Sequence, residues 1–293
     1  MPEYHADGVT PFHVCKYDSS TGKMTRDTRY GQDGKTWKID EFDAQTGKRV
    51  KELQYHADGK NLSMVSECNG DKIMKGVVYY NNGNVQCTFD VVKGESIGYT
   101  MDGKIKQISK FEPEPYGIPT YRREKILERT HYFDDGKVSC SVKYNYETGK
   151  ETKTFFKKDG KTPLAEFEKG VEEYEPAKGT LFETDGKTEL FFNKGNVSKS
   201  VTYKNDGRKV VTEFDPADSK LSTKNVYDKD GNIECVIKKD YNLISEELEA
   251  KVLSKDGQVT DIINPENFGS NKYMDLSDKE RDIYKSLSRQ YDA

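Results

Sequence analysis

The chain has 293 residues, of which 33% are charged, and its net charge at neutral pH is only −4. Basic and acidic residues are nearly balanced, so the chain lacks the basic excess of a nucleic-acid-binding protein, and no segment approaches the roughly 20 apolar residues of a membrane-spanning helix. Hydrophobic residues also make up only 33%, but aromatic residues reach 11%, which is more than a disordered chain carries. Composition therefore predicts a folded protein with a thin core.

The first residues repeat a later part of the chain. The letters YHADG occur at 4–8 and again at 55–59, so the chain opens partway through a repeat unit. This predicts a fragment of a longer protein. The N-terminus has no basic stretch followed by an apolar one, as a signal peptide would, but because a fragment is predicted, both a cytoplasmic and a secreted location stay open.

Two stretches, 17–36 and 42–61, share their turn residues and little else. Each begins with an aromatic-Asp-x-x-Thr-Gly-Lys motif, in which Asp can cap backbone amides and Gly can supply a positive φ. Similar segments occur at 144–150 and at 214–220, where Ser219 replaces the glycine. A shorter Asp-Gly turn or a relative of it recurs at Asp33, Asp58, Asp102, Asp159, Asp185 and Asp230.

The segments between these turns alternate between apolar and polar residues. Val85, Cys87, Phe89 and Val91 share one face, for example, and similar patterns begin at Val138 and Val197. A period of two over about eight residues, bounded by glycine turns, indicates half-buried antiparallel strands. We therefore expect an all-β fold, an extended twisted antiparallel sheet of tandem β-hairpins with a period of about 24–25 residues.

One proline-rich segment interrupts the array. The prediction is an N-terminal hairpin array at 1–111, a linker or insertion at 112–130 and a second array at 131–260. The same segment can also be interpreted as a loop inserted into a continuous sheet.

The last region, 261–293, is predicted to be a loop and a helical cap. Within 276–291 the pattern changes to a helical period, with a capping box at Ser277 and Glu280. The expected role is to cover the open end of the sheet, and a helix for dimerisation or partner binding is the alternative.

The five cysteines are interpreted as ordinary strand residues. Their number is odd, their spacings are wide and no C-x-x-C motif occurs, so neither a disulfide framework nor a zinc site is predicted. Three of the five fall within alternating strand patterns, where a small buried hydrophobic side chain is the simpler interpretation. The five are Cys15, Cys68, Cys87, Cys140 and Cys235.

Short motifs carry a resemblance to known repeats. YYNNGNVQC (79–87), YFDDGKVSC (132–140) and FFNKGNVSK (191–199) resemble the MORN-variant repeats of the bacterial YwqK-type antitoxin family. The TGK and DGK units are more similar to another tandem bacterial repeat of unknown function with a period near 24, and the spacing distantly resembles the YD repeats of Rhs-type shells. These resemblances imply tandem β-hairpins and no catalytic residue.

No residue stands out as catalytic. His5 and His56 occupy the same repeat position beside a turn, and the sequence near His13 and His131 contains no partner that suggests catalysis. Asp228, Asp230 and Asn232 alternate as calcium ligands do, but the glycine and the acid of an EF-hand loop are out of place. We predict no catalytic, cofactor-binding or metal-binding residue, no cofactor and no enzymatic activity.

The expected function is a non-enzymatic repeat scaffold whose extended surface binds a protein partner. Aromatic doublets at 79–80, 132–133, 155–156 and 191–192 allow a second hypothesis, in which exposed rings bind a glycan. Cross-strand packing of the same rings is the structural interpretation. A third hypothesis, an immunity or antitoxin-like protein, depends on the family resemblance alone.

Overall fold

The computed structural model describes residues 3–114, 118–119, 125–170, 176–218, 221–241 and 248–263. These ranges contain strands, turns and loops but no helix, so the all-β prediction is confirmed for them. No helix with the length and apolarity of a membrane span is found in them either. The predicted helix at 276–291 lies outside the described residues.

The chain divides into two units, which we describe separately. The first comprises 1–144 and 158–160, and the second comprises 145–157 and 161–293. The strands of the first unit are β1 (Glu3–Tyr4), β2 (Pro11–Tyr17), β3 (Met24–Tyr30), β4 (Thr36–Phe42), β5 (Arg49–Tyr55), β6 (Leu62–Asn69), β7 (Lys72–Tyr79), β8 (Val85–Asp90), β9 (Glu95–Tyr99), β10 (Ile105–Phe111), β11 (Ile118–Pro119), β12 (Ile126–Tyr132) and β13 (Val138–Asn145). Those of the second are β14 (Lys150–Phe156), β15 (Pro163–Gly170), β16 (Lys178–Glu183), β17 (Gly186–Asn193), β18 (Asn196–Lys204), β19 (Lys209–Phe214), β20 (Ser222–Tyr227), β21 (Ile233–Tyr241), β22 (Leu248–Leu253) and β23 (Val259–Ile263).

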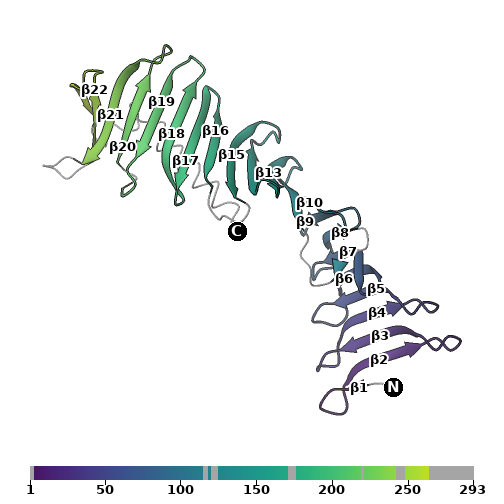
Figure 1. Cartoon of the computed structure of the whole chain (residues 1–293). Helices are drawn as coiled ribbons and strands as arrows, with labels where there is room; N and C mark the ends of the chain where they lie inside the picture. Colours follow the sequence, from purple (N-terminus) through teal and green to yellow (C-terminus); the bar gives the residue numbers. More distant parts are fainter. Residues whose placement is uncertain are drawn as a thin grey trace. The chain divides into compact units, whose positions relative to one another are not determined.

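Within each unit the strands, apart from the short β11, pair in chain order, each antiparallel to the one before it (Figure 1). The predicted tandem hairpins are therefore confirmed. The segment predicted as a linker, 112–130, falls inside the first unit. There β10 pairs directly with β12, while the short β11 returns to pair with the start of β7.

The two predicted kinds of turn are present. In the longer kind, Asp18 accepts hydrogen bonds from the amides of Ser20 (3.0 Å) and Thr21 (2.8 Å), and Gly22 has a φ of 67°. In the shorter kind, Asp33 accepts one from the Lys35 amide at 3.1 Å. The turn aspartates thus bind the backbone as capping groups and set the hairpin geometry.

The segment 227–232, in which Asp228, Asp230 and Asn232 alternate as calcium ligands do, is a turn of the shorter kind. Asp228 accepts hydrogen bonds from the amides of Asp230 and Asn232, both at 2.9 Å. The capping carboxylate is therefore Asp228, with Asp230 one of its donors.

These capped turns predict acid-sensitive stability. Hydrogen bonds from Ser20 and Thr21 lower the pKa of Asp18 from its ordinary value of 3.8 to about 2, and bonds from Thr10 and Val9 lower that of Asp7 to about 2. Because the unfolded chain binds protons more readily, the stabilisation is complete above about pH 4 and is lost as the pH falls towards about 2. We expect the urea midpoint to fall over this window, and Asp18→Asn to flatten the dependence. A midpoint that is constant down to about pH 2 would contradict the prediction.

Most hairpins contain a β-bulge next to the turn. The sequence does not predict these bulges. Arg29 lies opposite Lys38, but Tyr30 lies opposite Thr36, so Trp37 has no partner. The same one-residue shift occurs at the aromatic residue that ends β5, β7, β9 and β12. A bulge bends the strand and increases its twist, and it interrupts the strict alternation of faces at the edge of the sheet.

The two faces of the first unit differ in chemistry. We call them the Asp27 face and the Thr28 face after adjacent residues of β3. One cross-strand row of the Asp27 face has a polar stretch in which Asp27, Asp40, Glu52 and Ser66 are all buried. The row consists of Cys15, Asp27, Asp40, Glu52, Ser66, Gly76, Phe89, Ser96, Ser109, Arg129 and Val142.

The second unit has a more conventional core. One cross-strand row on one face of its sheet is completely buried, and its only polar pair, Thr188 and Thr202, shares a hydrogen bond of 2.9 Å between the hydroxyls. The row consists of Phe155, Ala165, Leu181, Thr188, Thr202, Val210, Val226 and Cys235. Burial of these side chains is the main driving force for folding of this unit.

Candidate functional site

The buried acidic residues of the Asp27 face are matched by basic side chains on the same strands. Lys38 Nζ lies 3.0 Å from Glu52 Oε2 and 3.4 Å from Asp40 Oδ2. Arg49 places one terminal nitrogen 2.6 Å from Glu52 and 3.3 Å from Asp40. Its other nitrogens donate to the carbonyls of Gly70 (3.1 Å) and Asp71 (3.2 Å). Arg49 therefore links two buried carboxylates to the turn of the next hairpin.

These contacts keep Glu52 ionised in spite of its burial. Burial by itself raises the pKa of a carboxyl group. Hydrogen bonds from Gln54 and Lys38 and the charges of Lys38 and Arg49 outweigh that effect, and the pKa of Glu52 lies below its ordinary value. This cluster satisfies its own charges and is best explained as part of the core.

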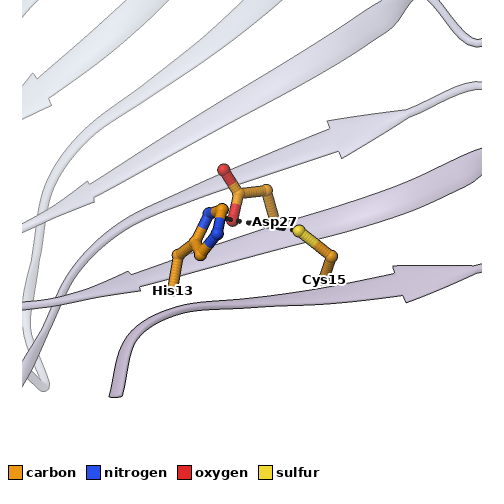
Figure 2. A group of neighbouring side chains, drawn as sticks. All are labelled: His13, Cys15 and Asp27. Atoms are coloured by element: carbon orange, nitrogen blue, oxygen red, sulfur yellow. Dashed lines mark hydrogen bonds and ion pairs between the residues drawn. The ribbon is translucent and has the colours of Figure 1, made fainter. Parts of the chain in front are cut away.

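A second cluster, on β2 and β3, contains three different donor groups (Figure 2). His13 and Cys15 are two residues apart on β2, so both side chains point to the Asp27 face, and Cys15 lies directly opposite Asp27. His13 Nδ1 is 3.3 Å from Asp27 Oδ1, and the Cys15 thiol donates to the same oxygen at 3.8 Å. One ligand atom from each of the three side chains lies within 4.8 Å of the others.

The surroundings orient this cluster. Glu3 Oε2 lies 3.3 Å from His13 Nε2, and Arg29 Nε lies 3.0 Å from the second oxygen of Asp27. Asp27 is 4% exposed, whereas Cys15 is only half-buried. Burial and the charge of Asp27 raise the pKa of the Cys15 thiol above its ordinary value. The thiol is therefore protonated at neutral pH, which makes it a poor nucleophile.

The cluster of His13, Cys15 and Asp27 was not predicted from the sequence. His13 and Asp27 are far apart in the sequence, and only the register of the β2–β3 hairpin brings them together. The signal that could have found it is the His-x-Cys spacing on an alternating strand, read together with the hairpin turn at 17–23. The other histidine near the N-terminus, His5, binds the Tyr30 carbonyl at 3.1 Å, in agreement with its expected structural role.

The short turns of the first unit, such as those at 80–84 and 100–104, lie at one edge of its sheet, which we call the short-turn edge. This edge carries two adjoining hollows of about 300 and 370 Å³. Tyr80 and Met101 line both of them. The first is also lined by His56, whose Nε2 atom is buried without a hydrogen-bond partner, and by the carboxamides of Asn81, Asn82 and Gln86. The second is also lined by the doublet Tyr132 and Phe133.

The aromatic doublets are half-buried or buried, and none has an exposed ring. Tyr80 donates its hydroxyl hydrogen bond to the Tyr99 carbonyl at 2.8 Å. Phe155 packs edge-on against Phe167 with ring centroids 6.0 Å apart, and Phe167 packs against Phe192 at 6.3 Å. Ring packing between strands therefore accounts for one ring of each doublet of the second unit, Phe155 and Phe192.

Fold and sites together define an antiparallel β-hairpin repeat protein. A family model described as "Protein of unknown function (DUF2963)" matches residues 4–43 and 30–77. The two matches begin about one repeat period apart and lie on β1 to β7. They agree with the resemblance of the TGK and DGK units to a repeat of unknown function, while the MORN-variant resemblance stays a prediction. Among curated proteins, none matches the chain.

Solved structures give only weak similarities. The crystal structure of TcdB2-TccC3-TEV matches at 11% identity with a TM-score of 0.20, over 85% of this chain and 15% of that one. A mutant Tc holotoxin pore of Photorhabdus luminescens matches at 10% identity and a TM-score of 0.17, over 88% of this chain and 14% of that one. A eukaryotic initiation factor matches at 10% identity and a TM-score of 0.19, over 89% of each chain. Scores this low do not define a shared fold.

Proposed function

We propose that the chain is a non-enzymatic repeat scaffold and that the Thr28 face of its first unit binds a protein partner. The observation that carries this proposal is a pair of neighbouring side-chain rows that cross eleven strands. The first row is mostly apolar or β-branched: Val14, Thr28, Ile39, Leu53, Val65, Val77, Thr88, Ile97, Ile108, Thr130 and Ser141. All of these residues are half-buried except Ile39, which is buried.

The second row runs beside the first and is charged at every position. It consists of Lys16, Arg26, Glu41, Lys51, Glu67, Lys75, Asp90, Glu95, Lys110, Glu128 and Lys143. Opposite charges on neighbouring strands favour the correct register. Because six basic and five acidic residues nearly cancel, the row adds little net charge, but its order of signs can distinguish between partners. An apolar stripe beside such a row supports a specific protein interface.

The test uses two adjacent residues of β8 that point to opposite faces. A photo-cross-linking amino acid is placed at Thr88, on the Thr28 face, or at Cys87, on the Asp27 face, and the full chain is produced in its native cells. We expect a discrete protein adduct from position 88 and little from position 87. Adducts of equal yield from both positions would contradict the proposal.

Charge reversal provides a second arm. Lys51→Glu with Lys110→Glu reverses two charges of the row, whereas Lys35→Glu with Lys104→Glu reverses two exposed turn lysines. The first pair should abolish the adduct and the second should preserve it, while circular dichroism confirms that both variants fold. Retention of the adduct in the first pair would exclude the charged row as part of the interface.

The hollows at the short-turn edge favour a second candidate function, glycan binding. Tyrosine rings stack on sugar faces, and the carboxamides of Asn81, Asn82 and Gln86 can hydrogen-bond sugar hydroxyls. If this site is functional, Tyr80→Ala should abolish binding on a glycan array, whereas Tyr203→Ala, which removes an exposed tyrosine of the second unit, should not. Absence of array binding by the parent chain would remove this candidate.

A further inference from the structure

Two of the three spacings between the donor atoms of His13, Cys15 and Asp27 match those of a metal-binding site, and all three atoms lie within 4.8 Å of one another. The distances of 3.3 Å between Nδ1 and Oδ1 and 3.8 Å between Sγ and Oδ1 join atoms of three ligand types (Figure 2). Ligand atoms bound to tetrahedral zinc at about 2.0–2.3 Å are themselves separated by about 3.3–3.8 Å. The cluster can therefore close around zinc with small side-chain movements.

We propose that His13 Nδ1, Cys15 Sγ and Asp27 Oδ1 bind one zinc ion, with water as the fourth ligand. A set with one nitrogen, one sulfur and one oxygen suits zinc, whereas calcium and magnesium require oxygen ligands. The side chain of His13 is 24% exposed, which leaves solvent access for the entry of the ion and for the bound water.

The groups around the cluster support this proposal independently. A metal-binding histidine usually donates its second ring N–H to a carboxylate. A carboxylate is in place for this role at His13, because Glu3 Oε2 lies 3.3 Å from Nε2, the nitrogen that faces away from Asp27. Arg29 binds the other oxygen of Asp27 at 3.0 Å, which orients Oδ1 toward the thiol and the imidazole.

In the next repeat, the positions equivalent to His13, Cys15 and Asp27 include a lysine, whose ammonium group is a cation supplied by the chain itself. Twenty-five residues after His13, Cys15 and Asp27 stand Lys38, Asp40 and Glu52. Asp40 and Glu52 lie in the cross-strand row of Cys15 and Asp27, and Lys38 lies in the neighbouring row that contains His13. There the Lys38 ammonium group lies between the two carboxylates, 3.4 and 3.0 Å away. In the first repeat the lysine is replaced by histidine and one acid by cysteine. An ammonium group is thus replaced by an imidazole, and a carboxylate by a thiol, and both of these side chains can bind a metal ion.

The experiment titrates the full chain, purified without a histidine tag, reduced and treated with chelator, with Zn²⁺ in a calorimeter. We expect one zinc per chain and a higher melting temperature with zinc present. Co²⁺ in place of Zn²⁺ should give the thiolate-to-cobalt charge-transfer absorption that reports a bound cysteine. Absence of one-to-one binding would overturn the proposal.

Variants separate this site from adventitious binding. Cys15→Ser should remove the cobalt charge-transfer absorption and weaken zinc binding at least about tenfold, and Glu3→Gln should weaken it about 10- to 100-fold. The double variant His13→Lys with Cys15→Asp gives these two positions the residues found in the second repeat, Lys38 and Asp40, so it should fold and bind no zinc. Cys87→Ser, on β8, is the matched control and should bind normally. Zinc binding by the double variant, or loss of the cobalt signal in Cys87→Ser, would place the metal elsewhere.

Discussion

Replacement of Arg49 by methionine should lower the free energy of unfolding of the first unit by about 3–5 kcal/mol, which is the usual cost of removing one partner of a buried ion pair. The Arg49 side chain is 14% exposed, and that of Glu52 is 2% exposed. Without the guanidinium, Glu52 keeps Lys38 as a basic partner, and Asp40 keeps Lys38 and the more distant Arg29, 3.8 Å away. The carbonyls of Gly70 and Asp71 lose the hydrogen bonds that Arg49 donates. Methionine fills much of the same volume, so the loss is electrostatic rather than a cavity effect.

Urea unfolding followed by circular dichroism measures this effect, and Arg26→Met is the matched control. Arg26 lies 3.9 Å from Glu41, and both side chains are substantially exposed, at 40% and 37%. An exposed pair contributes about 0–1 kcal/mol, so the control should unfold nearly as the parent does. Equal losses in the two variants would show that burial does not set the strength of these ion pairs.

The turns made the fold predictable from the sequence. Asp18, Gly22 and their equivalents recur with a fixed spacing because each turn sets the register of a hairpin, and a slip by one residue would exchange the two faces. The side chains between turns need only be apolar or polar, so they vary between copies while the pattern survives. Hairpins and their antiparallel pairing were therefore predicted correctly.

The register within each hairpin was not predictable in the same way. The bulge that leaves Trp37 unpaired depends on backbone geometry beside the turn, and alternation of residue types gives no sign of it. Without the register, Asp27 could not be placed opposite Cys15, and the three buried acids could not be placed in one row. Alternation of residue types assigns charged side chains to the solvated face, whereas here Asp40 and Glu52 form ion pairs with Lys38 and Arg49 and are part of the core.

The glycines inside strands test how tightly the sheet packs. Gly76 lies next to Ser66 in the cross-strand row of the Asp27 face that contains Asp27. A Cβ at this position would come within 2.6 Å of Phe89 Cζ, 2.8 Å of the Val65 carbonyl oxygen and 2.9 Å of Ser66 Oγ. The ring can move, but the carbonyl belongs to the neighbouring strand and cannot move without disturbing the sheet. Gly76→Ala should therefore destabilise the first unit by about 1–3 kcal/mol, the usual cost of overpacking.

Gly98 on β9 provides the matched control. Its nearest neighbour to an added Cβ is Gln107 at 3.9 Å, so alanine fits without a clash and should stabilise the strand by about 0.5–1 kcal/mol. Urea midpoints of the two variants should therefore shift in opposite directions. A second substitution then identifies the cause of the clash. If Phe89→Leu restores the stability of Gly76→Ala, the ring was the obstacle, and if it does not, the Val65 carbonyl or the Ser66 hydroxyl was. If the urea midpoints of Gly76→Ala and Gly98→Ala shift in the same direction, the backbone effect of replacing glycine dominates at both positions. The predicted clash with Phe89 and the neighbouring strand would then be wrong.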